Sequence, residues 1–452
     1  MTNRTRIWRD TIPSIPARPV TLRVTAVAER VLRQGHPWVY AASILRQRHE
    51  GPPGAFAVIY DQRQRFLAVG LYDPDSPIRV RVLQRYTPTP ITRVWFEQRL
   101  AAAVDARKTL ARDPQTTAYR LVHGENDGLP GLVIDRYADT AVIKLYTAAW
   151  VPHIPDVLEA FRRVVPMSRM VLRLSRAIQQ RPAVLHGLTD GLVLDGPPLR
   201  APIMIQEYGL RFEVDPIHGQ KTGWFLDQRE NRAMVSQLSG GCSVLDVCAY
   251  TGGFSVAAAR GGARAVTSVD ISRQALDAAQ RNMALNRRIR AVAAARHEVL
   301  VGDAVDVLER LKRRGTRFDL VVIDPPSFAK SEREVRGALA AYARLTRAGL
   351  SVLATSGTLV VSSCSSHVKA DEFFSAVHHT AARAGWVLRE VARTGHPLDH
   401  PIRFSEGAYL KCLVAVAQRR PRRTPHVREQ TNSVARPARV RVSSSRSGQD
   451  AR

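Results

Sequence analysis

Hydrophobic residues recur along this chain with two different spacings, and the change of spacing separates a β-rich N-terminal part from a mixed C-terminal part. Near the N-terminus the apolar residues lie in short runs, and the run at 78–83 alternates apolar and basic residues. Such alternation is typical of a half-buried strand with one charged face. From residue 244 onward, short β-branched runs alternate with longer segments of helical periodicity. Strands that alternate with helices predict an α/β fold with a mostly parallel, doubly wound sheet.

Residues 21–202 are predicted to form two small domains before the doubly wound one. The first is a small β-barrel whose arginine-bearing faces either bind RNA or simply face solvent. Its predicted strands lie at 21–25, 55–60, 66–70 and 78–83. The second is an α+β unit that ends near residue 202. Its predicted elements are a helix at 91–112, strands at 141–146 and 170–174, and a helix at 155–164.

A polar cluster lies in the second domain, formed by His123, Glu125, Asn126 and Asp127. Residues of these types occur in catalytic sites, but Asn and Asp also form turns through local hydrogen bonds. The neighbouring glycines mark turns between strands, so we favour a structural, turn-forming role for the cluster.

In the C-terminal region nearly every predicted strand is followed by a predicted helix. The strands are predicted at 210–215, 244–247, 265–269, 298–303, 318–324 and 358–362, with a terminal pair near residues 387 and 410. The helices are predicted to end at residue 260 or to span 273–286, 305–313, 332–353 and 371–384. The chain therefore divides into a loose, proline-containing leader over 1–20, domains over 21–88, 89–202 and 203–418, and a disordered basic tail over 419–452.

Composition adds a polyanionic partner to this picture. The formal net charge is +27 and the isoelectric point is near 11, which points to nucleic acid, although a general preference for arginine explains part of the excess. No window reaches the ~18 uncharged apolar residues of a membrane span, and the arginine-containing start lacks an apolar signal core. We therefore expect a cytoplasmic protein with no membrane contact. The four cysteines show neither metal-ligand spacing nor a disulfide framework, so we expect no metal.

The run from Val244 to Ser255 is the stretch around which the candidate chemistry gathers. It reads as a buried strand, a turn at Gly252 and Gly253, and the first turn of a helix, with glycines that let the backbone approach a ligand. An acidic residue falls at or near the end of each of four successive strands. These residues are Asp246, Asp270, Asp303 and Asp324. Helix N-capping explains any one of them, but a shared ligand explains all four better.

The ligand at this edge is expected to be a nucleoside without phosphates. Asp270 is placed to accept hydrogen bonds from a ribose diol, and Asp303 from an adenine amino group. Neither the G-x-G-x-x-G pattern of dinucleotide sites nor the P-loop pattern is present. A glycine turn flanked by acidic residues fits a cationic cofactor, which indicates S-adenosyl-L-methionine.

At this point the sequence resembles a known family. Four stretches carry the resemblance: Asp246-x-x-x-Tyr-Thr-Gly-Gly-Phe254, Asp324-Pro-Pro-Ser-Phe328, Ser363-Cys-Ser365 and the run Gly219-Gln-Lys-Thr-Gly-Trp-Phe-Leu-Asp-Gln-Arg229. Together they are similar to the RlmI-like class I methyltransferases, which form 5-methylcytosine in large-subunit ribosomal RNA. The resemblance implies a PUA-like RNA-binding domain over 21–88, the central α+β domain, and a Rossmann-like methyltransferase domain over 203–418. It alone suggests a homodimer.

The resemblance also implies roles for individual residues. The implied cofactor-binding residues are Gln228, Arg229, Asp246, Tyr250, Thr251, Gly252, Gly253, Phe254, Asp270, Ile271, Asp303, Ala304 and Asp324. The implied RNA-binding residues are Lys221, Pro325, Pro326, Ser327 and Phe328. The implied catalytic residues are Cys364 and Asp324.

Cytosine chemistry gives Cys364 a physical purpose. C5 of cytosine is a poor nucleophile, so a thiolate adds to C6 and makes an enamine whose C5 attacks the methyl group. The thiol must be reachable at a strand end and must ionise more easily than a free thiol, whose pKa is ~8.5. Cys364 meets the first requirement, because it lies just beyond a predicted strand. Asp324 on the neighbouring strand is placed to protonate or hydrogen-bond N3.

One departure from related enzymes leaves a step open. Many RNA cytosine-C5 methyltransferases carry a second cysteine where this chain has Ser327, so the base that releases the product is water or a nearby carboxylate. The Asp324-Pro-Pro-Ser-Phe328 run also resembles the motif of amino-nitrogen methyltransferases, whose aromatic residue stacks on a flipped base. N-methylation of guanine or adenine in RNA is therefore the alternative activity, and a non-catalytic RNA-binding assembly factor is the alternative of a different class.

Overall fold

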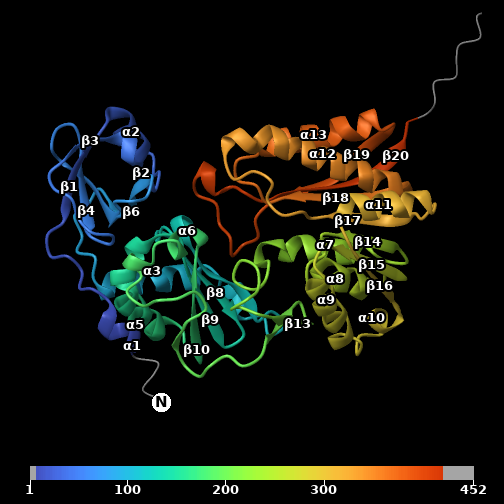
Figure 1. Cartoon of the computed structure of the whole chain (residues 1–452), viewed down its shortest axis with the longest axis horizontal. Helices are drawn as coiled ribbons and strands as arrows, with labels where there is room; N and C mark the ends of the chain where they lie inside the picture. The colour runs from blue at the N-terminus through green and yellow to red at the C-terminus, as the bar shows by residue number, and fades with distance from the viewer. Residues whose placement is uncertain (1–6, 421–452) are drawn as a thin grey trace, which may run out of the picture. The chain divides into compact units, whose positions relative to one another are not determined.

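Four sheets organise the part of the chain that the structure, a computed structural model, describes, which is residues 7–420 (Figure 1). They contain six, five, two and seven strands, and they follow one another along the sequence. The predicted basic tail over 419–452 lies almost entirely outside the described residues. Among residues 7–420 no helix is both long and apolar enough to cross a membrane.

The six-stranded sheet forms the N-terminal domain and has the order β2-β6-β5-β4-β1-β3. The four predicted strands are present within it, and β1 and β4 pair in parallel while the other neighbours are antiparallel. Its strands are β1 (Val20–Val24), β2 (Trp38–Tyr40), β3 (Ile44–Gln47), β4 (Phe56–Tyr60), β5 (Phe66–Tyr72) and β6 (Ile78–Arg85). The domain is not all-β as predicted, because α2 (Ala26–Arg33) crosses between β1 and β2. Thr25 caps this helix by accepting a hydrogen bond from the backbone of Ala28, and Leu32 anchors it in the core.

The prediction of a loose leader over residues 1–20 does not hold for residues 7–11. Residues Ile7–Thr11 form the short helix α1, and the Trp8 side chain is only 6% exposed. Its indole packs into the core of the second domain and donates a hydrogen bond to the carbonyl oxygen of Leu194. Proline-rich sequence hid this contact, because a single buried tryptophan leaves no periodicity.

The five-stranded sheet forms the central α+β domain and has the order β11-β10-β9-β8-β7. Its elements are α3 (Arg93–Asp105), α4 (Lys108–Ala111), β7 (Ala118–His123), β8 (Leu132–Tyr137), β9 (Thr140–Leu145), α5 (Ile154–Val164), β10 (Arg169–Leu174), α6 (Arg176–Gln179) and β11 (Val193–Asp195). The single helix predicted over 91–112 is divided near Arg107. The fully buried Arg107 guanidinium reaches Asp127 at 2.7 Å and the carbonyl oxygen of Asp399 at 3.0 Å.

The polar cluster of the central domain makes structural contacts. Asp127 also accepts the backbone N–H of His123, Asn126 accepts the backbone N–H of Arg403, and Glu125 accepts the indole N–H of Trp38. A hairpin of β12 (Ile203–Glu207) and β13 (Leu210–Val214) then leads to the last domain.

The seven-stranded sheet has the order β16-β15-β14-β17-β18-β20-β19, and all its pairs are parallel except those of β20. Its strands are β14 (Ser243–Val247), β15 (Ala265–Asp270), β16 (Arg296–Val301), β17 (Phe318–Ile323), β18 (Leu353–Ser363), β19 (Trp386–Thr394) and β20 (Lys411–Arg419). The helices are α7 (Arg229–Leu238), α8 (Gly253–Arg260), α9 (Arg273–Leu285), α10 (Arg290–Ala294), α11 (Ala304–Arg313), α12 (Val335–Val352) and α13 (Ala370–Arg383).

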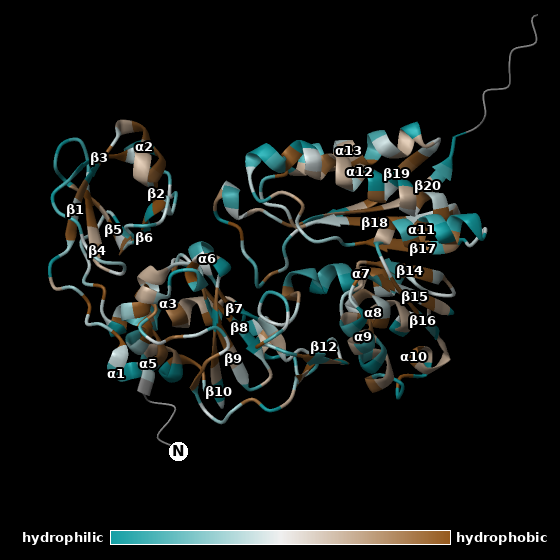
Figure 2. Ribbon diagram, in the orientation of Figure 1, coloured by the Kyte–Doolittle hydropathy of each residue, from teal (hydrophilic) through white to brown (hydrophobic). Residues whose placement is uncertain are grey.

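Alternation along the central strands builds two cores, one on each face of this sheet. Leu245 and Val247 pack with α11, α12 and α13, whereas Val244 packs with α7, α8 and α9. Successive side chains of a strand point to opposite faces, so a strand buried on both sides is hydrophobic throughout. Figure 2 shows these strands as hydrophobic ribbons between helices with mixed surfaces. The predicted doubly wound α/β architecture is confirmed.

Candidate active site

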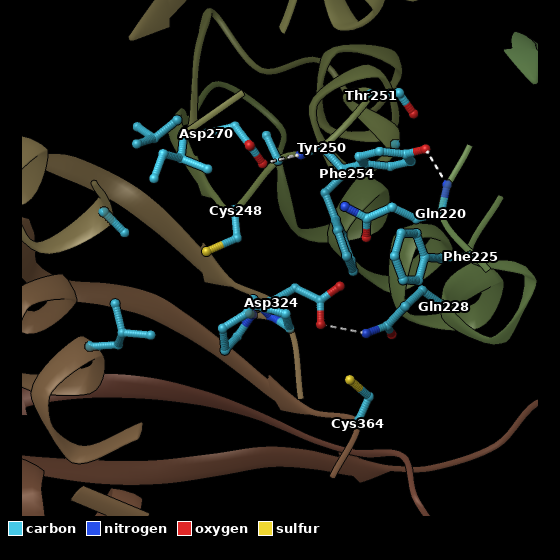
Figure 3. A pocket seen from close by; sticks show the side chains of 18 of the residues that line it. Gln220, Phe225, Gln228, Cys248, Tyr250, Thr251, Phe254, Asp270, Asp324 and Cys364 are labelled. Carbon is cyan, nitrogen blue, oxygen red and sulfur yellow. Dashed lines mark hydrogen bonds between the residues drawn. The ribbon is translucent and has the colours of Figure 1, made fainter. Parts of the chain in front are cut away.

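A cavity of about 320 Å³ lies at the carboxyl ends of β14, β15 and β17 (Figure 3). Ligands of open α/β sheets gather at this edge. Three of the four predicted strand-end acids line the cavity, namely Asp270, Asp303 and Asp324. The sheet therefore brings together side chains that lie up to 54 positions apart, as the count from Asp270 to Asp324 shows.

The loop after β14 is held in a tight, left-handed path. Cys248, Tyr250 and Gly252 all have positive φ angles, of 64°, 48° and 79°. A non-glycine residue pays for such a backbone with strain, which is common at functional sites. The carboxylate of Asp270 fixes the loop by accepting the backbone N–H of Tyr250 at 2.9 Å.

The two glycines of this loop are required by protein packing. A Cβ atom on Gly252 would lie 2.8 Å from the Cβ of Ala279 in α9, and one on Gly253 would lie 3.2 Å from the Trp224 ring. From the sequence, the approach of a ligand was the expected reason for these glycines. The structure gives them a different reason, which is the close contact between the loop, α9 and the segment before α7.

Asp270 and Asp303 each combine a structural bond with free acceptor capacity. Asp270 also accepts the backbone N–H of Ser272, and Asp303 caps α11 by accepting the backbone N–H of Val305 at 2.9 Å. A carboxylate has about four lone-pair sites, so both groups can accept further hydrogen bonds. Helix capping thus explains Asp303 but not Asp270. Hydrogen bonds from a ribose to Asp270 and from an adenine to Asp303 remain compatible with these structural contacts.

Three predicted cofactor residues do not line the cavity. Asp246 is fully buried beneath it and accepts a hydrogen bond from Ser255, and burial raises the pKa of Asp246 to about 7. Arg229 is fully buried in an ion pair with Asp399 at 2.9 Å. Gly252 packs against α9, as described. For these residues the structure supports an indirect, supporting role rather than contact with a ligand. The other ten predicted cofactor residues line the cavity: Gln228, Tyr250, Thr251, Gly253, Phe254, Asp270, Ile271, Asp303, Ala304 and Asp324.

Asp324 and Cys364 lie at the end of the cavity that faces away from Asp270. Ile323 pairs with Val361 across β17 and β18, so Asp324 and Cys364 leave two neighbouring parallel strands at nearly the same level. Gln228 donates its side-chain N–H to the Asp324 carboxylate at 2.7 Å, as Figure 3 shows. Burial, with the nearby charge of Asp227, raises the pKa of Asp324 to about 7. This carboxyl group can therefore both accept and donate a proton near neutral pH.

An ion-paired cluster around Lys221, which lines the cavity with Cys364, includes residues that were given no role from the sequence. The Lys221 ammonium lies 2.6 Å from Asp227 and 4.6 Å from the centre of the Phe225 ring. Asp227 also accepts a hydrogen bond from the hydroxyl of Tyr409 at 2.9 Å. Burial opposes ionisation of Asp227, but Lys221 outweighs it and lowers the pKa of this carboxyl. Burial likewise opposes the charge on Lys221, but Asp227 raises the pKa of this amine. Asp227 and Phe225 stand in the run that carries the family resemblance, whereas Tyr409 is 182 residues from Asp227 and had no sequence signal.

The Cys364 thiol is not activated in the protein alone. Burial raises its pKa to about 11, and the positive charge of Lys221 only partly opposes this effect. Cys364 therefore has the position that the mechanism requires, but its thiol does not ionise easily. Cys248 also lines the cavity, and burial with the nearby Asp270 raises its pKa to about 12.

The predicted RNA-binding residues after β17 divide between two cavities. Pro325, Pro326 and Phe328 line the first one. The Phe328 ring packs edge-on against Tyr342, with ring centres 5.0 Å apart. The hydroxyl of Ser327 bonds to the carbonyl oxygen of Ala329 and to Ser365.

A second cavity, of about 520 Å³, reaches Cys364 from a different side. Its walls come from all three domains and include Trp38, Tyr146, Ser327 and Tyr409. The two cavities share Cys364 and Lys221. The thiol thus stands where the two spaces meet.

The first cavity fits S-adenosyl-L-methionine. Its wall holds the carboxylates expected for a ribose and an adenine, and the buried hydroxyl of Thr251 lacks a hydrogen-bond partner among the described residues. Arg232, one of the cations in its wall, is paired with Glu207 at 2.6 Å. Within residues 7–420 no group of three His, Cys, Asp or Glu side chains is arranged to hold a metal ion.

Comparison with known proteins agrees with this fit. The family model described as S-adenosylmethionine-dependent methyltransferase matches residues 120–415, and that of the PUA-like domain matches residues 22–85. The crystal structure of SMU.776 complexed with SAH superposes with a TM-score of 0.75 at 24% identity, covering 88% of this chain and 99% of that one. The fold and the site thus define an S-adenosylmethionine-dependent methyltransferase with an N-terminal PUA-like domain.

The relatives narrow this class to one family. The ribosomal RNA large subunit methyltransferase of Deinococcus radiodurans is 48% identical over 406 residues, which cover 89% of this chain and 98% of the relative. The ribosomal RNA large subunit methyltransferase I of Pseudoalteromonas translucida is 33% identical over 393 residues, covering 85% and 96%. The chain belongs to the ribosomal RNA large subunit methyltransferase I family, and the resemblance drawn from its sequence is confirmed.

Proposed function

We propose that this protein methylates C5 of a cytosine in large-subunit ribosomal RNA, with Cys364 as a covalent nucleophile. The observation that carries the proposal is the position of Cys364 where the cofactor cavity meets the second cavity. A base that enters the second cavity meets the thiol there and faces the methyl donor beyond it. The names of the relatives and the net charge of +27 support ribosomal RNA as the substrate.

The reaction begins with the conjugate addition of the thiol to C6 of the cytosine ring. The Cys364 sulfur bonds to C6, and the thiol proton passes through the Asp324 carboxyl group to N3 of the base. Because the pKa of Asp324 is about 7, its ionised form accepts the thiol proton and its protonated form donates to N3. The ring becomes an enamine with an electron-rich C5. S-adenosylmethionine, when bound, supplies an electrophilic methyl group on a sulfonium sulfur.

Neighbouring side chains hold these two groups in position. Asn231 donates to the side-chain oxygen of Gln228, which leaves the Gln228 amide nitrogen facing Asp324. Lys221 places a positive charge beside the sulfur and lowers the cost of a thiolate. These contacts fix the acid and the nucleophile before the base arrives, which is how enzymes reduce the cost of reorganisation.

The product is released when C5 loses its proton and the bond from C6 to sulfur breaks. Ser327 stands where many related enzymes have a second cysteine, and its hydroxyl is engaged with Ala329 and Ser365. We therefore assign the C5 proton to a water molecule or a nearby carboxylate rather than to Ser327. The electron pair of the C5–H bond restores the C5–C6 double bond, and Cys364 leaves as a thiolate that recovers its proton from N3.

The packing of Phe328 disfavours the alternative of amino-nitrogen methylation. That chemistry uses an aromatic ring after the proline pair to stack on a flipped base. Here the Phe328 ring is engaged edge-on with Tyr342, and that reading also leaves Cys364 idle.

Methyl transfer to ribosomal RNA tests the proposal. The purified protein is incubated with radiolabelled S-adenosylmethionine and large-subunit ribosomal RNA, and the RNA is digested to nucleosides. Label in 5-methylcytidine supports the proposal. Label in an N-methylated purine points to the alternative enzyme, and no transfer points to a non-catalytic assembly factor.

Two variants then test the role of the thiol. Cys364→Ala is expected to lose turnover, whereas Cys242→Ser is expected to keep it, because Cys242 lies before β14 at the opposite end of that strand. Wild-type turnover by Cys364→Ala would exclude the covalent route.

A further inference from the structure

Tyr146 is an aromatic residue whose exposure needs a reason. It follows β9 of the central domain, and 49% of its surface is accessible although it lines the second cavity. Large apolar side chains in a cavity wall are usually there to contact a ligand. The Lys144 ammonium lies 5.4 Å from the centre of the Tyr146 ring, so one cation already contacts the ring.

The surroundings of Tyr146 suit an uncharged, planar ligand. Arg120 lies in the same wall, but its guanidinium forms a bidentate ion pair with Asp135, with N–O distances of 2.7 and 3.0 Å. Lys144 donates to the carbonyl oxygen of Lys221, and burial, with the charge of Arg173, lowers its pKa to about 8. Beside Tyr146, the charge of Arg120 is thus neutralised by Asp135, and Lys144 loses its proton more easily than a free lysine.

The cavity also continues from Tyr146 to the nucleophile. Tyr146, Tyr409 and Cys364 line one space. Tyr409 is fixed by its hydrogen bond to Asp227 and by edge-on contact with His396, whose ring centre is 4.5 Å away. Within the described chain, the Tyr146 side chain makes neither a hydrogen bond nor a ring–ring contact. Its ring can therefore change orientation to contact a ligand in this space.

We infer that Tyr146 is the stacking platform for the acceptor nucleotide, and that the central domain thereby recognises the RNA base as it is presented to Cys364. This inference rests on the proposed function, since it supposes an RNA cytosine as the substrate. Bases taken out of an RNA stack lose their stacking energy, and an aromatic ring in the protein restores part of it. Trp38 of the N-terminal domain also lines this cavity, so the space is built by all three domains.

The test compares Tyr146→Ala with Tyr146→Phe and Tyr146→Leu. The substrate is a large-subunit ribosomal RNA transcript made with 5-fluorocytidine. Fluorine at C5 cannot leave as a cation, so the methylated adduct with the protein stays covalent and is counted on a denaturing gel. The rate of adduct formation is measured against RNA concentration with saturating S-adenosylmethionine.

Loss of the ring is expected to raise the half-saturating RNA concentration by roughly 5- to 150-fold for Tyr146→Ala, which is the range for a base stacked on an aromatic side chain. Tyr146→Leu should behave like Ala, and Tyr146→Phe should stay within about twofold of wild type because it keeps the ring. Cofactor affinity, measured by calorimetry, should be unchanged in all three variants, because Tyr146 does not line the cofactor cavity.

Every other result contradicts either the proposed function or the stacking inference. A wild-type protein that forms no adduct contradicts the proposed function itself. If wild type forms the adduct and Tyr146→Ala saturates at the same RNA concentration, the stacking inference is wrong. It is equally wrong if Tyr146→Phe is as impaired as Tyr146→Ala, which would show a role for the hydroxyl, or if cofactor affinity falls in parallel, which would show a structural role.

Discussion

The resting protein is predicted to hold Cys364 as an unreactive thiol. Its pKa is raised to about 11 because the sulfur is buried, although Lys221 works against this effect. At pH 8 a free thiol with a pKa of ~8.5 is about one quarter thiolate, whereas a thiol with a pKa of about 11 is about one thousandth thiolate. The higher intrinsic nucleophilicity of a more basic thiolate recovers about tenfold of this difference of roughly 200-fold.

Alkylation should therefore be about 20-fold slower at Cys364 than at a free thiol. Iodoacetamide labelling over a pH range, followed by mass spectrometry of the peptide that contains Cys364, measures this rate. A raised pKa means that the thiol loses its proton only as pH rises, so the rate should still be increasing at pH 9. Lys221→Met should slow it further, since the main opposing charge is removed. An apparent pKa at or below 8.5 would refute this reasoning and make proton acceptance by Asp324 unnecessary.

Three further predictions follow from contacts around the site. Asp324→Asn should lower turnover by about 10²- to 10⁴-fold, the usual contribution of a general acid–base group, while cofactor affinity measured by calorimetry changes less. Asp270→Ala should weaken S-adenosylmethionine binding by roughly 10- to 100-fold in the same assay, since a charged acceptor and the anchor of the Tyr250 loop are both lost. Asp399→Ala should lower the free energy of unfolding by about 3–5 kcal/mol in denaturant titrations, because it strands the buried Arg229 charge. The pKa of Asp399 is lowered in the fold, so the stability that it contributes should be complete above about pH 4 and lost only as pH falls below the value of an unfolded aspartate.

Local patterns in the sequence were enough to place most of the methyltransferase domain. Strands buried on both faces are mostly hydrophobic, as in β14 and β17, and acidic residues stand at or near their ends. Parallel strands end at one edge, so Asp324 and Cys364 could be expected to meet although 40 positions separate them. The cofactor cavity followed from the same rule.

The parts that could not be predicted depend on contacts between distant segments. Asp227 bonds both to Lys221 and to Tyr409, which precedes β20, and no periodicity in the sequence indicates this contact. Trp8 lies in a proline-containing stretch without a pattern, yet it fills the core of another domain. Asp246 ends a strand like the other acids, but its side chain lies beneath the cavity, and sequence position alone does not tell the two orientations apart.

The raised pKa of Cys364 also lay beyond sequence reasoning. The serines that flank Cys364 suggested a polar environment, whereas Ser363 and Ser365 are fully buried and bond to Tyr342 and Lys411. Ionisation of a thiol depends on the balance between burial and nearby charge, which only the folded arrangement defines.

Peptide mapping of the trapped adduct is the most direct test of the covalent route. The wild-type protein is incubated with S-adenosylmethionine and 5-fluorocytidine-containing large-subunit ribosomal RNA, digested with nuclease and protease, and analysed by mass spectrometry. The account predicts a methylated fluoropyrimidine nucleotide attached to the peptide that contains Cys364. Attachment at Cys248, the other thiol in the cofactor cavity, or formation of 5-methylcytidine on ordinary RNA without any adduct on the fluorinated one, would contradict it.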